Sequence, residues 1–122
     1  MDHLLNWVEI PVANMKRAIG FYRELLSVDV QEMKLGDNDY ALFAIKNHFN
    51  TGCLVKGPGY IPRTDGVVVY LNGGDDLSKP LSRVEKAGGK ILLTKTFLSD
   101  EAGHIAYFKD TEGNKIGLHS MN

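Results

Sequence analysis

The sequence has little of what marks secreted, membrane-spanning or nucleic-acid-binding proteins. Its 122 residues include one cysteine, Cys53, so the chain cannot form an internal disulfide. No apolar run approaches the roughly 18 residues that span a bilayer, and the N-terminus shows no basic region before an apolar stretch. The formal net charge of −1 lacks the basic surplus typical of nucleic-acid binders. We therefore expect a cytoplasmic protein with no nucleic-acid or membrane partner.

The composition is that of a folded domain. Hydrophobic residues make up 43% of the chain and charged residues 24%, which argues against disorder. The length corresponds to one domain, residues 1–122.

The first half of the chain, residues 1–57, is predicted to hold a strand, a helix and three further strands. Alternation over residues 4–12 predicts a strand with Val8, Ile10 and Val12 on one face and Trp7, Glu9 and Pro11 on the other. Apolar residues then recur every three or four positions over residues 15–26, which predicts an amphipathic helix capped by Asn14. Extended runs follow at 28–34, 40–45 and 52–55.

The second half, residues 66–122, follows a connector at 58–65 that is rich in proline, glycine and polar residues. A strand is predicted at 66–71, then a helix that starts at Asp76 and stops at Gly88 and Gly89. Three strands are predicted at 90–97, 104–109 and 114–119, the last after a turn formed by Asp110, Gly113 and Asn114. The two halves thus repeat one order of elements, with hardly any shared residues.

The segment EIPV with ANMKRAIGFYRELL, together with the terminal DTEGNKIGLH, resembles the vicinal oxygen chelate superfamily, which includes glyoxalase I, bleomycin- and fosfomycin-resistance proteins and extradiol dioxygenases. The most specific pieces are Phe21-Tyr22, Gly88-Gly89 and Asp110-x-x-Gly113-Asn114. This resemblance implies an α+β fold in which two βαβββ modules form curved mixed sheets around a central cleft, often in a homodimer.

The resemblance also implies where a divalent metal would be held. In metal-using members, four side chains from the first, fourth, fifth and eighth strands are the ligands. Here these positions fall on Trp7, on Cys53 or Leu54, on Gly66 and on Gly117. Glycine has no side-chain donor atom, the tryptophan N–H cannot ligate a cation, and one thiolate does not make a site. We therefore expect no cofactor and assign no metal ligand, although a divalent metal held by other residues stays open.

Strand alternation predicts which side chains face the cleft. These are Trp7 and Glu9 on the first strand, Val68 and Tyr70 on the fifth, and Lys115 and His119 on the eighth. Aromatic walls with a few polar groups suit a small amphipathic or aromatic ligand, so Trp7, Val68, Tyr70 and Lys115 are candidate ligand-binding residues.

Three functions are consistent with this pattern. The first is a metal-free protein that binds a small organic ligand. The second is an enzyme, either a lyase, isomerase or epimerase or a dioxygenase, with Glu9 as base and His119 as its partner or second proton carrier, or with a metal held by unusual ligands such as these two. In the third, the chain is a structural or regulatory module. For Glu9 itself, a structural ion pair with Lys115 or His119 is the alternative to catalysis.

Overall fold

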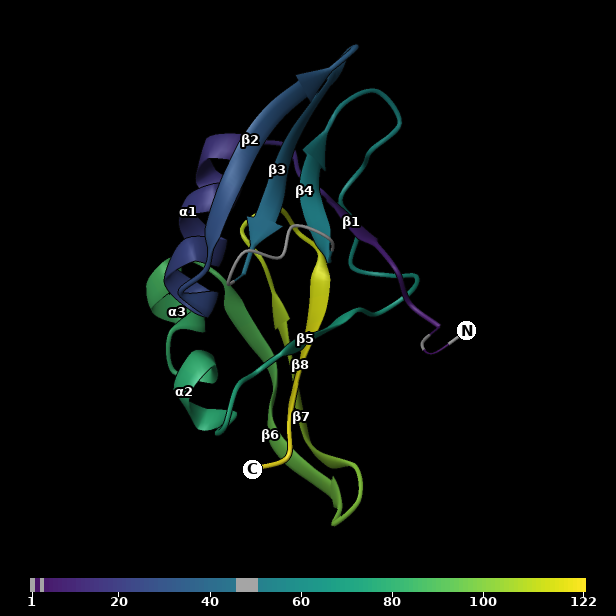
Figure 1. Cartoon of the computed structure of the whole chain (residues 1–122). Coiled ribbons are helices and arrows are strands. Elements are labelled where there is room, and N and C mark those ends of the chain that lie inside the picture. The colour runs from purple at the N-terminus through teal and green to yellow at the C-terminus, as the bar shows by residue number, and fades with distance from the viewer. Residues whose placement is uncertain (1, 3, 46–50) are drawn as a thin grey trace.

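The computed structural model describes residue 2 and residues 4–45 and 51–122. Two similar groups of elements follow one another along the chain (Figure 1). The first module contains β1 (Val8–Pro11), α1 (Met15–Leu26), β2 (Asp29–Leu35), β3 (Asn38–Ala44) and β4 (Gly52–Lys56). The second contains β5 (Tyr70–Asn72), α2 (Ser78–Leu81), α3 (Val84–Ala87), β6 (Lys90–Ser99), β7 (Gly103–Lys109) and β8 (Lys115–Ser120).

Each module builds one four-stranded mixed sheet, and the two sheets have the same topology. The strand orders are β1-β4-β3-β2 and β5-β8-β7-β6. In each sheet the first and last strands of the module pair in parallel, and the remaining pairs are antiparallel. The predicted α+β class and the two βαβββ modules are confirmed. No helix among the described residues is long and apolar enough to cross a membrane.

Helix α1 forms where its periodicity predicts it. The Asn14 side chain accepts a hydrogen bond from the Arg17 N–H at 3.0 Å, which satisfies one of the free donors of the first turn. The helix ends at Ser27, whose left-handed backbone lets its N–H bond to the Arg23 carbonyl. The buried face consists of Ala18, Ile19, Phe21, Tyr22 and Leu25.

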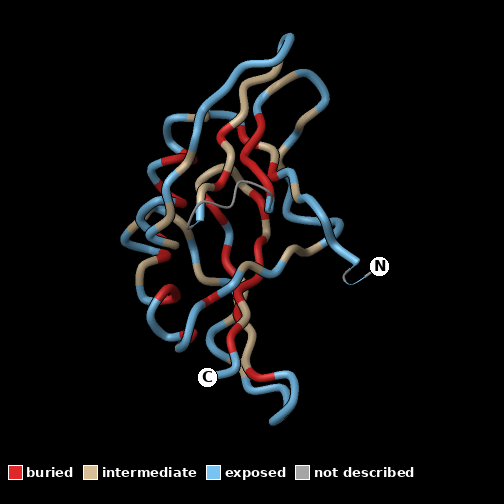
Figure 2. Tube along the Cα trace, in the orientation of Figure 1, coloured by how far each residue is buried: buried red, intermediate tan, exposed pale blue. Residues whose placement is uncertain are grey.

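The two modules share one hydrophobic core. The Phe21 ring of α1 lies 5.6 Å from the ring of Phe108 in β7, so a first-module helix packs on a second-module strand. Leu54 of β4 and Leu118 of β8 belong to the same buried cluster. Figure 2 shows that the buried segments run through the middle of both sheets, while the hairpin ends are exposed. Burying one such large side chain stabilises the fold by about 1.5–3 kcal/mol.

The single helix predicted after Asp76 is wrong, because the segment forms two short helices. The N-cap position of α2 is Leu77 rather than Asp76, although the Asp76 carboxylate still accepts from the Ser78 N–H at 2.9 Å. The Ser82 hydroxyl donates to the Lys79 carbonyl, and the Arg83 N–H bonds to the Pro80 carbonyl, one residue nearer than in an α-helix. The chain tightens at Ser82 and Arg83, and α3 then ends at Gly88 as predicted.

Two strands are shorter than predicted, and both lose their first residues. Strand β1 starts at Val8 rather than Leu4, and Leu4 is 83% exposed. Strand β5 starts at Tyr70 rather than Gly66, because the ladder with β8 begins where the Gly117 N–H bonds to the Val69 carbonyl. Gly66 lies outside the sheet with a positive φ of 98°.

Candidate functional site

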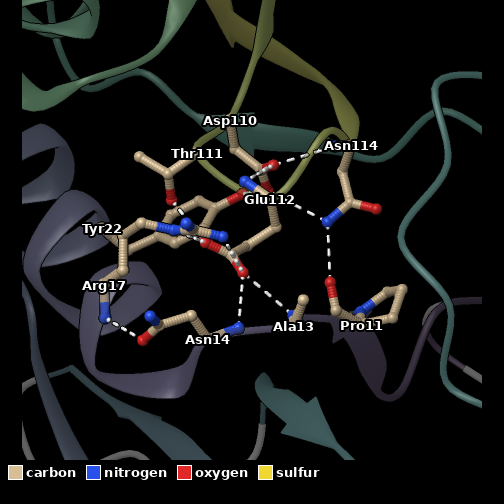
Figure 3. Close-up of polar contacts among 9 residues, drawn as sticks. All are labelled: Pro11, Ala13, Asn14, Arg17, Tyr22, Asp110, Thr111, Glu112 and Asn114. Atoms are coloured by element: carbon tan, nitrogen blue, oxygen red, sulfur yellow. Dashed lines mark hydrogen bonds and ion pairs between the residues drawn. The ribbon is translucent and has the colours of Figure 1, made fainter.

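The turn between β7 and β8 holds the second module against the start of α1 (Figure 3). The Glu112 carboxylate accepts from the backbone N–H groups of Ala13 at 2.9 Å and Asn14 at 2.7 Å. It also accepts from the Arg17 guanidinium, at 2.7 Å from Nε and 3.1 Å from Nη2. A carboxylate at the N-terminus of a helix is favoured by the helix dipole as well as by these donors.

Glu112 is ionised at neutral pH because of these donors. Burial of the group opposes ionisation, but the hydrogen bonds from Arg17, from the Asn14 and Ala13 N–H groups and from the Thr111 hydroxyl outweigh it and lower the pKa of Glu112 to about 2. The side chain of Glu112 is fully buried, whereas that of Arg17 is half exposed. The carboxylate thus acts as a fixed charge between the modules.

Asp110 and Asn114, the first and last residues of the turn, complete this junction. The buried Asp110 accepts the Tyr22 hydroxyl at 2.7 Å and the side-chain amide of Asn114 at 3.0 Å. The same Asn114 amide donates to the Pro11 carbonyl at 2.8 Å, which connects the end of β1 to the start of β8. The predicted turn is confirmed by the bond from the Gly113 N–H to the Asp110 carbonyl. The junction fixes the positions of the two strands that carry most candidate site residues.

The first sheet has one face against the core and one inner face. Ile10 pairs with Leu54 on the core face, and Glu9 pairs with Cys53 on the inner face. The register therefore assigns the fourth-strand position to Cys53 and not to Leu54. Burial raises the pKa of Cys53 to about 11, the nearby Glu9 charge adds to this, and a hydrogen bond with Trp7 opposes it. The thiol is fully buried and protonated at neutral pH.

Trp7 and Glu9 remain accessible on this inner face. Trp7 is 41% exposed. The hydroxyl of Tyr60, from the connector, donates to the Glu9 carboxylate at 3.0 Å. The sequence gives no signal for Tyr60 because a connector tyrosine has no strand register to place it.

Two tyrosine side chains and one lysine side chain lie together on the inner face of the second sheet. Tyr70 of β5, Tyr107 of β7 and Gly117 of β8 are aligned across the three strands. The hydroxyls of Tyr70 and Tyr107 lie 2.8 Å apart, and the Lys115 ammonium lies 4.3 Å from the centroid of the Tyr107 ring. The hydrogen bond with Tyr107, with a smaller contribution from burial, raises the pKa of Tyr70 to about 12. The sequence pattern predicts Tyr70 at the site but gives no signal for Tyr107.

Gly117 explains how the Tyr70 ring fits there. A Cβ at Gly117 would lie only 2.7 Å from Cε1 and 2.9 Å from Cγ of Tyr70. The ring therefore packs directly on the β8 backbone, which only glycine permits. Val68 is partly buried and precedes β5 by two residues.

Glu9 and His119 are not joined in the described part of the chain. His119 Nε2 contacts the Ala102 carbonyl at 2.6 Å, and Glu9 bonds to Tyr60. Among the described residues, no hydrogen bond or ion pair connects Glu9 to Lys115 or His119. The structural ion pair considered for Glu9 is thus replaced by a tyrosine hydroxyl.

A sequence profile described as "Glyoxalase/Bleomycin resistance protein/Dioxygenase superfamily" matches residues 4–118. The chain belongs to this superfamily. A search of the curated proteins finds no relative with significant sequence similarity.

Solved structures of the superfamily share the fold. A glyoxalase family protein from Bacillus cereus has a TM-score of 0.71 at 19% identity, over 97% of this chain and 93% of that one. TnmS3, an antibiotic-binding protein from Streptomyces sp. CB03234, has a TM-score of 0.62 at 22% identity, over 96% and 94%. Glyoxalase I from Zea mays has a TM-score of 0.69 at 23% identity over 94% of this chain, which spans only 45% of the maize protein. At these identities the likeness shows the fold alone.

The residues at the superfamily's metal positions do not fit a divalent ion. Glu9 pairs with Cys53 and Tyr70 pairs with Gly117, so the fifth-strand counterpart of Trp7 is Val68 and not Gly66. The four positions then hold Trp7, Cys53, Val68 and Gly117, of which only the buried, protonated thiol has a ligand atom. Across residues 4–45 and 51–122, no group of three His, Cys, Asp or Glu side chains could hold a metal ion.

Proposed function

We propose that this superfamily member binds a small organic ligand on the inner faces of its two sheets, without the usual metal centre. One observation carries the proposal: where metal-using members place ligand side chains, this chain has apolar, aromatic and glycine residues beside accessible aromatic groups. Tyr70 is 42% exposed on the face that strand alternation directs away from the core, and Trp7, which directly precedes β1 and bonds to Cys53, is 41% exposed. Aromatic walls with few polar groups are typical of sites for small organic molecules.

The comparison with TnmS3 supports the same conclusion. That protein is described as antibiotic-binding and shares this fold over nearly the whole of both chains. A fold can host unrelated functions, so the support comes from the site residues and the shared fold together.

Native mass spectrometry of freshly purified protein, before and after denaturation, tests the proposal. We expect a native mass that exceeds the 13.5 kDa chain mass, or twice that mass for a dimer, by the mass of an organic molecule that is released on denaturation. A stoichiometric divalent metal in its place would overturn the proposal. Trp7 is the one tryptophan, so its fluorescence is a second readout: the same molecule added back should change the emission.

The alternative function is an enzyme of the superfamily with Glu9 as general base. The observation that favours it is the position of the Glu9 carboxylate on the exposed inner face, with the Tyr60 hydroxyl as a hydrogen-bond donor. The substitution Glu9→Gln retains the shape of the side chain and removes its basic carboxylate. Glu32→Gln, on the opposite face of the same sheet, is the control. If any turnover found for the protein is unchanged in Glu9→Gln, Glu9 is not the base.

We also infer a homodimer in solution. Two pairs of neighbouring large apolar side chains are exposed and would be covered in a dimer: Leu4 at 83% and Leu5 at 76% before β1, and Phe97 at 58% and Leu98 at 51% in β6. Sedimentation equilibrium should give twice the 13.5 kDa chain mass. A single-chain mass at all concentrations would contradict this.

A further inference from the structure

A row of three lysines crosses the inner face of the second sheet. Lys90 of β6 is opposite Lys109 of β7, which is opposite Lys115 of β8. Residues that pair across neighbouring strands project from the same face of a sheet, and like charges directly opposite one another are destabilising. The repulsion between these lysines lowers the stability of the fold, so their alignment is better explained by a binding function.

No acidic side chain among the described residues neutralises the charges of these lysines. Salt bridges in the described residues involve Arg17, Arg23, Lys34, Lys79 and Lys95, and none of them includes Lys90, Lys109 or Lys115. Lys115 is partly buried, and its ammonium is held over the Tyr107 ring. A cation–π contact of this kind positions an ammonium group and leaves its charge uncompensated. An anion bound at Lys115 would compensate the charge.

The tyrosine pair beside Lys115 supplies a neutral donor. Two hydroxyls that share one hydrogen bond leave one O–H free, whichever of them donates within the pair. The hydroxyl that accepts is polarised by its partner and becomes a stronger donor. The pair and the ammonium lie on the same face, since Tyr107 pairs with Gly117 and Lys109 with Lys115.

We propose that Lys115 and the Tyr70–Tyr107 hydroxyl pair bind the acidic group of an aromatic acid, whose ring lies against the accessible aromatic side chains of the inner face. This inference rests on the proposed function and names the class of its ligand. Lys90 and Lys109 raise the local positive potential, and Lys115 makes the direct contact.

A matched pair of compounds tests the proposal on the whole chain. Calorimetric titration is carried out with 2-naphthoate, an aromatic carboxylate, and with 2-naphthamide, its neutral analogue of the same shape. Wild-type protein should bind the carboxylate at least about tenfold more tightly, as a charge-assisted contact would give. Lys115→Met should remove this preference, and Tyr107→Phe should reduce it. Lys86→Met, the same charge change on α3, should leave it intact.

The outcomes separate this inference from the proposed function. Equal binding of both compounds, or a preference that survives Lys115→Met, overturns the assignment of an acid and leaves small-molecule binding standing. If neither compound binds, the assignment is also overturned, and the adduct in native mass spectrometry decides the proposed function by itself. Circular dichroism and the Tm of Lys115→Met show that the variant is folded.

Discussion

Arg17 and Glu112, 95 residues apart in the sequence, form a two-point ion pair that joins the helix of the first module to the last turn of the second. The same carboxylate accepts the first free N–H groups before α1. Since β1 ends and β8 begins at this junction, the pair holds the two sheets in a fixed relation (Figure 3).

Glu112→Gln should lower the free energy of unfolding by about 2 kcal/mol at pH 7, because the amide NH₂ group faces N–H donors that the carboxylate satisfied. The pKa of Glu112 is lowered in the folded protein, so the folded state binds fewer protons than the unfolded state between about pH 4.5 and about 2. The contribution is therefore complete above about pH 4.5 and is lost as the pH falls towards 2.

Urea unfolding of both proteins across this pH range measures the effect. The difference between wild type and Glu112→Gln should shrink on acidification. Glu24→Gln, on the exposed side of α1, is the control and should change stability by less than about 0.5 kcal/mol. A difference that stays constant with pH would show that the charge of Glu112 has no part in stability.

Tyr22→Phe should cost about 1–2 kcal/mol, since it leaves the buried Asp110 without its hydroxyl donor. Burial, with the charge of Asp110, holds the pKa of Tyr22 well above its usual value, so the hydroxyl keeps its proton at neutral pH and can donate it to Asp110. Tyr70→Phe removes a hydroxyl from a half-exposed ring and should change stability less. Equal losses in thermal unfolding of the two variants would contradict the account of the junction.

Gly117→Ala should displace the Tyr70 ring, because the new Cβ would overlap it. The ring is 42% exposed and can swing outward, so we expect a loss of stability below about 1 kcal/mol with a clear loss of ligand affinity. Calorimetry and thermal unfolding of one preparation measure both. Unchanged affinity would mean that the Tyr70–Tyr107 pair does not contact the ligand.

Gly20→Ala should stabilise the protein by about 0.5–1 kcal/mol, because Gly20 lies within α1 on its exposed side and a Cβ there would meet no neighbouring atom. Gly52→Ala is the matched opposite, since its Cβ would collide with the carbonyl of Val8 in the neighbouring strand. Chemical denaturation should move the midpoints of the two variants in opposite directions. A destabilised Gly20→Ala would indicate that something packs on this side of α1.

The sequence predicted what local patterns determine. Helix α1, its Asn14 cap and the turn at Asp110 depend on residues a few positions apart, and the alternation of β1 separated Ile10 from Glu9 correctly. The break between α2 and α3 was missed because the side-chain bond of Ser82 competes with an otherwise regular apolar period. Two features depend on partners far along the chain. One is the register of β5 with β8, which places Val68 rather than Gly66 at the fifth-strand metal position. The other is the bond of Glu112 to Arg17.

The assignment of Trp7, Val68, Tyr70 and Lys115 as ligand-binding residues stays a prediction. The sequence also predicts that His3, His48 and His104 are solvated or locally hydrogen-bonded, and the first two of these lie outside the described residues. His104 does bond locally, to the Met121 carbonyl at 3.2 Å. The lysine row was invisible in the sequence because Lys90, Lys109 and Lys115 are brought together only by the pairing of three strands.

Elemental analysis of the protein, purified without chelator and dialysed separately against Mg²⁺, Mn²⁺, Fe²⁺, Co²⁺, Ni²⁺ and Zn²⁺, tests the central claim most directly. Because the four metal positions hold Trp7, Cys53, Val68 and Gly117, we expect far less than one ion per chain in every case. One tightly held divalent ion per folded chain, lost in Cys53→Ala or Glu9→Gln, would contradict the claim that an organic ligand has taken the place of the metal centre.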